Sequence, residues 1–402
     1  MEHQIIALLI GVLAFAALSR WLTSRWLTAP LLFVAFGLAS GTAGLGWLDI
    51  DPEAELIEGL AEATLVLVLF ADASRIDVRA LRTDLGIPLR LLAIGMPLTI
   101  ALGALLAAAI FPAWSMWEAA VIAAILAPTD AALGQPVVNS GAVPARIRRA
   151  LNVESGLNDG IALPVVLVFI AMAALPAEPG QSWLVFWLVQ VTAGPALGAA
   201  IGASGGLLLR LSHDAKLANE SWSAIGALTL AGLCYFGAEA AGGNGFMAAF
   251  IGGMAFGATS ASLGHKVHDF METEGQMLML AVFILLGCAL AGPALASATP
   301  ASVAYAALSL TVIRIVPVAI AMTGAGLDRR TVAFLGWFGP RGLASILFGM
   351  LLVGRDSLPH GEAIFHVVVL TVLGSVLAHG LTSAWGAETY GRSQLGADNT
   401  AH

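Results

Sequence analysis

Thirteen apolar segments, each long enough to cross a lipid bilayer, are spread along the whole chain. A membrane-spanning helix needs about 20 mostly apolar residues. The predicted helices cover residues 3–22, 27–48, 54–72, 87–111, 115–138, 147–175, 182–210, 222–240, 243–261, 276–293, 300–324, 331–353 and 361–385. The linkers between them are too short for an extramembrane domain. The pattern predicts one compact all-α polytopic membrane protein with about 13 transmembrane helices.

The composition of the chain agrees with this fold class. Of the 402 residues, 58% are hydrophobic and only 11% are charged, and the mean hydropathy is +0.88. A soluble domain carries about 25% charged residues, so a soluble globular fold is excluded. A disordered chain is excluded as well, because it would need low hydrophobicity and high net charge. The segments are apolar all round, which disfavours a β-barrel with strands of alternating polarity.

Several classes of partner and cofactor are not expected. The two cysteines, Cys234 and Cys288, lie inside apolar segments, so neither a disulfide framework nor a paired-cysteine metal site is predicted. No basic cluster is interleaved with aromatic residues, which argues against nucleic acid binding. The first segment lacks a positively charged start and a small-residue cleavage site, and it is therefore expected to be a retained helix.

Lysine and arginine are distributed unequally between the two sets of alternating loops. Such residues are enriched on the cytoplasmic side of a membrane. One set, counted with the C-terminal tail, holds Arg20, Arg25, Arg75, Arg79, Arg82, Arg90, Arg146, Arg148, Arg149, Arg210, Lys216, Lys266, Arg329, Arg330 and Arg392. The opposite loops hold only Arg355. The distribution predicts a multi-pass protein of the cell (inner) membrane, with its N-terminus outside and its C-terminus in the cytoplasm.

Few charged residues remain inside the predicted spans. Five lie near the middle of the bilayer: Asp130, Glu154, Asp159, Arg314 and Arg341. Glu62 and Asp72 lie closer to helix ends, where headgroups or water can solvate them. A charge at the bilayer centre costs at least about 2.5–3.5 kcal/mol, so the five are functional candidates. The alternative for each is structural, with an acid and an arginine paired to hold helices together.

Two of the predicted helices contain helix-breaking residues beside a charge. In the fifth segment Pro128 precedes Thr129 and Asp130, and in the twelfth Gly-Pro precedes Arg341. Breaks of this kind are typical of inverted-repeat transporters with a midplane site, and a spacing of seven segments gives the two helices opposite orientations. Asp130 and Arg341 have opposite signs and suit the partial charges at the two breaks. The alternative is a pair of ordinary Pro/Gly kinks.

The sixth segment concentrates polar residues at helical spacing. Ser155 and Asp159 are four residues apart, as are Glu154 and Asn158, so each pair shares one face of a helix. Hydroxyl, amide and carboxylate oxygens are suitable ligands for a hard cation such as Na⁺. Thr129 and Asp130 could complete such a site.

These motifs resemble the paired signatures of monovalent cation:proton antiporters of the bacterial NhaP and eukaryotic NHE type. The runs that carry the resemblance are APTD at 127–130 and ESGLNDG at 154–160. It extends in order through FILLG at 283–287, Arg314, GPRG at 339–342 and SVLAHGLT at 375–382. It therefore covers nearly the whole chain.

The resemblance implies a homodimer of two inverted six-helix repeats with crossed discontinuous helices 5 and 12. The core ion-transport domain would comprise helices 4–6 (86–176) and helices 11–13 (299–387). The dimerisation domain would comprise helices 1–3 (1–85) and helices 8–10, which follow linker helix 7 within 177–298. Residues 388–402 would form a short cytoplasmic tail.

The resemblance also implies roles for individual residues. Asp159 would bind the cation and the proton alternately, with Asp130 close by. Three further oxygen-bearing residues would surround the ion: Thr129, Ser155 and Asn158. Asn158 stands where electrogenic relatives have a second Asp, which implies electroneutral exchange of one cation for one proton. No cofactor is implied besides the transported ions.

Glu154 matches a residue that pairs with a core arginine in this family. The resemblance favours Arg314 as its partner, with Arg341 as the other candidate.

The predicted function is exchange of Na⁺, Li⁺ or K⁺ for H⁺ by alternating access. Because desolvation raises the pKa of a carboxylic acid, the proton and the cation can compete for one carboxylate within the working pH range of the protein. A sodium-coupled symporter of an organic anion could use the same architecture, but it would need a larger cavity. A channel and an intramembrane hydrolase fit the pattern less well, and selectivity between Na⁺ and K⁺ stays open.

Overall fold

A computed structural model of the chain describes residues 6, 9–11, 13–15, 17–18, 27–48, 55–74, 86–174, 183–260, 265–353 and 358–400. All regular elements among them are helices, apart from one isolated β-bridge between Gly41 and Leu48. Seven of the described helices are long and apolar enough to cross a membrane: 86–110, 145–173, 192–214, 220–240, 275–296, 300–321 and 361–394. The prediction of an all-helical polytopic membrane protein is confirmed at this level.

The ends of several helices differ from those of the predicted segments. Most of the first segment, 3–22, lies outside the described residues. The second, 27–48, was predicted as one helix, but α2 (Ala29–Ser40) ends early, and turns that include Gly46 at φ +67° follow it. At the other end, α18 (Gly361–Thr400) continues through the predicted tail. The residues predicted as a short cytoplasmic tail are thus helical as far as Thr400, and Tyr390 among them packs against Phe334. That they lie on the cytoplasmic side stays a prediction.

Three predicted helices are continuous in path but irregular in hydrogen bonding. A π-helical turn, η2 (Leu91–Gly95), joins α4 (Gly86–Arg90) to α5 (Met96–Ile110) just before Pro97. A second, η4 (Leu286–Leu290), joins α12 (His265–Leu285) to α13 (Ala291–Ala296) just before Pro293. Proline lacks an N–H group and clashes with the preceding turn, so the local helix must change its register. The third, α14 (Pro300–Leu310) followed by α15 (Val312–Ala321), is interrupted at Thr311, ahead of Pro317.

Two other helices are fully interrupted, at the positions that the sequence predicts. The fifth segment forms α6 (Met116–Ile125) and α7 (Ala131–Val138), separated by residues 126–130. The twelfth forms α16 (Arg329–Trp337) and α17 (Leu343–Met350), separated by residues 338–342. We call these stretches the α6–α7 break and the α16–α17 break. In contrast, α8 (Ala145–Ala173), which carries the polar sixth segment, is continuous.

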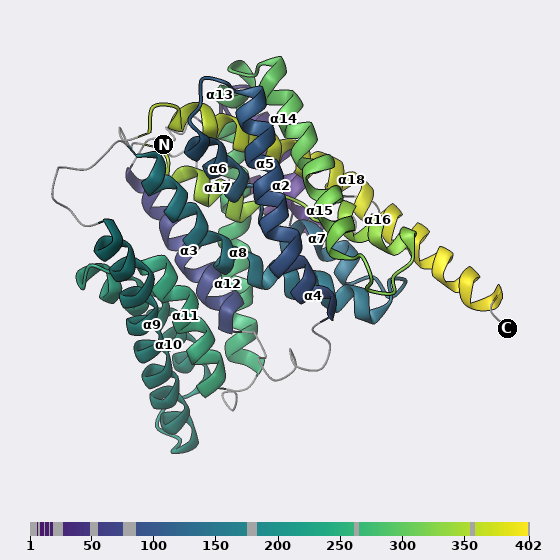
Figure 1. Cartoon of the computed structure of the whole chain (residues 1–402). Helices are drawn as coiled ribbons and strands as arrows, with labels where there is room; N and C mark the ends of the chain where they lie inside the picture. Colours follow the sequence, from purple (N-terminus) through teal and green to yellow (C-terminus); the bar gives the residue numbers. More distant parts are fainter. Residues whose placement is uncertain are drawn as a thin grey trace. The chain divides into compact units, whose positions relative to one another are not determined.

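The chain divides into two compact units, which are described separately. One contains residues 1–57, 84–158 and 280–402, and the other contains residues 58–83 and 159–279. The second unit includes most of α3 (Glu55–Ser74) together with α9 (Trp183–Asp214), α10 (Glu220–Ala240) and α11 (Gly245–Thr259). The last three helices pack side by side (Figure 1). Gly198 and Gly202 of α9 lie against the backbone of α11, because a glycine every four residues lets two helices approach closely.

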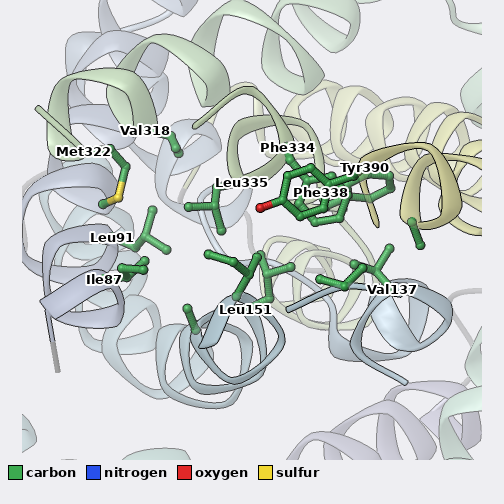
Figure 2. Close-up of a cluster of buried hydrophobic side chains, with 14 of the residues drawn as sticks. Ile87, Leu91, Val137, Leu151, Val318, Met322, Phe334, Leu335, Phe338 and Tyr390 are labelled. Atoms are coloured by element: carbon green, nitrogen blue, oxygen red, sulfur yellow. The ribbon is translucent and has the colours of Figure 1, made fainter. Parts of the chain in front are cut away.

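The first unit has a buried apolar cluster that joins both interrupted helices to their neighbours. Figure 2 shows Val137 of α7 near Leu151 of α8. It also shows Phe334 of α16 and Phe338, which directly follows α16, beside Tyr390 of α18. The Phe334 and Tyr390 rings stack with their centroids 4.1 Å apart. The cluster therefore packs α7 and α16, one half of each interrupted helix, against the long helices α8 and α18.

The N-terminus of α16 is fixed by a polar contact as well. Asp328 is the N-cap, and its carboxylate accepts hydrogen bonds from the backbone N–H and the hydroxyl group of Thr331. These bonds hold the pKa of the Asp328 carboxyl below its usual value. The Thr331 hydroxyl lies 2.7 Å from the Tyr390 hydroxyl, which connects this cap to α18.

Glu118 has the corresponding role at the start of α6. It forms a capping box with Ser115, in which Glu118 Oε2 accepts from the Ser115 N–H at 2.8 Å. Its other oxygen, Oε1, accepts from the His360 N–H at 3.1 Å and lies 3.0 Å from His360 Nδ1. One carboxylate, only 2% exposed, therefore connects the first half of a broken helix to the residues that precede α18.

Glu118→Ala should lower the free energy of unfolding by about 1–3 kcal/mol, because it leaves two backbone N–H groups without their acceptor. Thermal unfolding of the purified protein in detergent measures the change. The matched control is Glu388→Ala, which removes an exposed carboxylate paired with Arg392 at i+4 and should cost about 0.5 kcal/mol or less. Equal losses for the two variants would contradict the role given to Glu118.

Candidate functional site

The two breaks contact each other in the interior of the first unit. The Asp130 N–H donates to the Pro340 carbonyl oxygen at 2.8 Å, which joins the end of one break to the middle of the other. Asp130 is 7% exposed and Arg341 is fully buried. Each break thus places its charged residue against the backbone of the other helix.

The Asp130 carboxylate caps the N-termini of both short half-helices. Its Oδ1 accepts from the Leu133 N–H of α7 at 3.0 Å, and its Oδ2 accepts from the Leu343 N–H of α17 at 2.6 Å. Helix N-termini carry unsatisfied N–H groups and a partial positive charge. A Cβ atom added to Gly342 would collide with this carboxylate, so only glycine fits at that position of the break.

The Arg341 guanidinium group has the complementary role at the C-terminal end of α6. Its Nη1 donates to the Ala127 carbonyl and, at 3.0 Å, to the Pro128 carbonyl. The Ser345 hydroxyl of α17 donates to the Ile125 carbonyl at 2.8 Å. These carbonyls lie where a helix carries partial negative charge, which a cation stabilises.

Three of the predicted ion-binding residues form one hydrogen-bonded group. Asn158 Nδ2 donates to Thr129 Oγ1 at 2.7 Å, and Thr129 Oγ1 lies 3.0 Å from Ser155 Oγ. Since Thr129 accepts from Asn158, its own hydroxyl proton is available for Ser155. The arrangement brings residues of α8 next to the α6–α7 break, as the sequence predicts.

Glu154 and Arg314 form a buried salt bridge. Arg314 Nη1 lies 2.6 Å from Glu154 Oε1, and both side chains are at most 3% exposed. Of the two arginines considered as partners, Arg314 makes this contact. Gly339 lies directly against the Arg314 guanidinium group, where a Cβ atom would collide. The salt bridge therefore packs against the α16–α17 break.

Asp159 follows Asn158 directly in the uninterrupted helix α8 and is half-buried. It is four residues from Ser155 and so shares a helix face with that hydroxyl group. The division between the two compact units falls between Asn158 and Asp159.

Several polar contacts around the breaks were not predicted from the sequence. The Ser115-x-x-Glu118 spacing is a recognisable capping-box signal, but the contact with His360 joins residues far apart in sequence. Ser345 is an isolated serine in an apolar stretch, and nothing in its spacing points to Ile125. Ser375 and His379 belong to the quoted SVLAHGLT run, where their spacing of four predicts a shared helix face but not what that face contacts.

Comparison with known proteins identifies the family. Residues 5–388 match the family model described as "Sodium/hydrogen exchanger, transmembrane". The K(+)/H(+) antiporter NhaP2 of Shewanella sp. (strain ANA-3) is 28% identical over 363 residues, which cover 88% of this chain and 61% of that protein. The K(+)/H(+) antiporter NhaP of Alkalimonas amylolytica is 25% identical over 383 residues, which cover 93% and 64%. The chain thus spans about three fifths of the length of these curated relatives.

A solved structure has the same fold. The sodium proton antiporter MjNhaP1 from Methanocaldococcus jannaschii superposes with a TM-score of 0.77 at 18% sequence identity, covering 97% of each chain. The match of the family model to nearly the whole chain agrees with the resemblance noted in the APTD and ESGLNDG motifs. The chain belongs to the sodium/hydrogen exchanger family.

Proposed function

We propose that this protein exchanges a monovalent cation, Na⁺ or K⁺, for H⁺ across the membrane. The observation that carries the proposal is the arrangement at the two breaks, where Asp130 and Arg341 stabilise the interrupted helices beside the Thr129–Ser155–Asn158 group. Hard cations prefer oxygen ligands, and this group supplies hydroxyl and amide oxygens from two elements. The names of the relatives, K(+)/H(+) and sodium proton antiporters, agree with this class of substrate.

In this proposal the exchanged ions compete for Asp159. Asp130 and Glu154 contribute to the architecture of the breaks, since two backbone N–H groups occupy the oxygens of Asp130 and Arg314 pairs with Glu154. Along α8, Asp159 follows Asn158 and is one helical turn from Ser155. No described residue donates a hydrogen bond to Asn158 Oδ1, which is buried and suited to contact a cation.

Alternating access follows if the carboxylate can cross the barrier only when it is neutralised. A bare charge is costly at the bilayer centre, whereas a carboxylate with either a proton or a cation bound is neutral. In this proposal one cation is exchanged for one proton. The domains form the inverted six-helix repeats given above, and the protein is a homodimer with its N-terminus outside. Asn158 in place of a second acid supports the electroneutral ratio.

Asp159→Asn should abolish cation-dependent proton flux while leaving a folded protein. Proteoliposomes that contain a pH-sensitive dye measure the flux during titration with Na⁺, Li⁺ and K⁺, and the most effective ion identifies the substrate. Asp214→Asn, at the exposed end of α9, is the matched control and should transport normally. Full sodium- and potassium-dependent flux in Asp159→Asn would refute the assignment.

Gly342→Ala should reduce the exchange rate by about tenfold or more, because the new methyl group displaces the Asp130 carboxylate from the Leu343 N–H. The same flux assay measures it. Gly134→Ala is the control, since a Cβ atom at this position of α7 meets open space and alanine favours the helix. A Gly342→Ala variant as active as Gly134→Ala would show that the double cap is not needed.

Glu154→Leu should lower the free energy of unfolding by about 3–5 kcal/mol, because it leaves the Arg314 cation buried and unpaired. Thermal unfolding in detergent detects the loss. Replacing both partners, with Glu154→Leu and Arg314→Met together, should recover part of it, as expected for two residues that interact directly. Strictly additive losses would mean that the salt bridge contributes no coupling energy.

A further inference from the structure

Three of the four helix ends at the two breaks are stabilised by the residues described above. Asp130 caps the N-termini of α7 and α17, and Arg341 binds the carbonyls at the end of α6. The fourth end is the C-terminus of α16, where the last residue is Trp337. Helix C-termini leave carbonyl groups without intrahelical partners, and such groups need a donor inside a membrane.

At this fourth end the Gly339 N–H donates to the Trp337 carbonyl at 2.9 Å, and His379 of α18 supplies a second donor from a neighbouring helix. Its Nε2 lies 3.0 Å from the Trp337 carbonyl oxygen, and its ring packs against the Trp337 ring with centroids 5.1 Å apart. The His379 side chain is 1% exposed. A carbonyl oxygen can only accept, so Nε2 carries the proton.

Ser375, one turn earlier on α18, binds the other end of the same break. The Arg341 N–H donates to Ser375 Oγ at 2.7 Å, and Ser375 Oγ lies 3.1 Å from His379 Nδ1. Because the serine oxygen accepts from Arg341, its own proton can be donated to Nδ1. His379 Nδ1 also lies 3.0 Å from the Ser375 carbonyl oxygen, which is the i−4 carbonyl of α18 and accepts the backbone bond of the helix. With the Ser375 hydroxyl as the partner of Nδ1, the neutral ring protonated on Nε2 satisfies the Trp337 carbonyl, the serine hydroxyl and the Arg341 N–H together.

We propose that Ser375 and His379 are positioning residues that hold both ends of the α16–α17 break with a neutral imidazole ring. The pair lies on α18, and its side-chain hydrogen bonds go to Arg341 and Trp337 rather than to the three oxygen-bearing side chains of the candidate cation site. The pair acts on the site indirectly, in two ways. It positions Arg341, which binds the carbonyls at the end of α6. It also fixes the backbone next to Pro340 and Leu343, both of which contact Asp130. Its effect on transport rests on the proposed antiport, whereas its effect on the backbone does not.

Substitutions of His379 separate this role from a general structural one. His379→Gln can still donate an N–H group to the Trp337 carbonyl, and it should keep the apparent KM for the cation within about threefold. His379→Leu removes both ring contacts and should raise the apparent KM by about tenfold, as expected for one lost buried hydrogen bond. Equal effects of the two variants would overturn the proposal.

The pH profile of exchange tests whether the ring stays neutral. We call the contacts of Ser375 and His379 with the two ends of the break the clamp. Since the clamp needs no change of charge, His379→Gln should leave the pH of half-maximal exchange unchanged. A shift of about half a unit or more in that variant would mean that the ring titrates during transport, and would overturn the neutral assignment.

Hydrogen–deuterium exchange of the backbone tests the clamp without transport. Ser375→Ala and His379→Leu should each speed exchange of the Arg341 N–H by about tenfold relative to the unmodified protein. The control is Thr371→Ala, also on α18 and fully buried, whose hydroxyl donates only to the Val367 carbonyl of its own helix.

The outcomes are distinguishable. If Thr371→Ala changes Arg341 exchange and cation KM as much as Ser375→Ala, any lost buried hydroxyl on α18 has this effect, and the clamp is refuted. If the unmodified protein shows no cation–proton exchange, the proposed function fails, while the deuterium measurement still decides the clamp.

Discussion

A helix interrupted inside a lipid bilayer exposes backbone amide and carbonyl groups that have no water to bind. The structure meets this constraint by placing the two interruptions against each other, so that each supplies what the other lacks. Asp130 satisfies N–H groups on both α7 and α17, and Arg341 satisfies carbonyls at the end of α6. Asp130 and Arg341, whose charges are unfavourable inside the bilayer, thereby stabilise the backbone groups that the breaks expose.

The same constraint explains why the surrounding helices carry polar side chains at buried positions. The half-helices α7 and α17 have eight residues each, too few for stable isolated helices. Their stability must come from tertiary contacts. The apolar cluster of Figure 2 holds α7 and α16, Glu118 connects α6 to the residues before α18, and Ser375 and His379 contact the break itself.

The sequence predicts most of the fold, because long apolar segments and helix-breaking residues report local requirements. The breaks at Pro128 and at Gly339-Pro340 lie where predicted, since proline and glycine act on the backbone next to them. The helix ending at Ser40 was not predicted, because its Gly-containing continuation is as apolar as a span. The continuation of α18 to Thr400 depends on a tertiary contact of Tyr390, which spacing along the chain does not encode.

The candidate site, like the fold, is predicted only in part from the sequence. Helical spacing indicates that Ser155 and Asp159 share a face, and family resemblance supplies the pairing of Glu154 with an arginine. Neither reveals that Asp130 uses both of its oxygens on backbone N–H groups, because one of those donors is more than 200 residues away in sequence. Contacts of this kind depend on two breaks that meet in space, and only the three-dimensional structure shows that they do.

The partners of Asp130 and Glu154 bear directly on which acid exchanges ions. A carboxylate that caps two helices cannot release both donors for each transported ion without exposing them in a region that lacks water. Likewise, a glutamate bonded to a buried arginine cannot be protonated without leaving that cation unpaired. Neither acid can cycle between proton and cation at low cost. Asp159 belongs to the continuous helix α8, which has no interruption that an acid must stabilise. The proposed exchange thus assigns the variable charge to α8 and leaves the fixed charges to maintain the breaks.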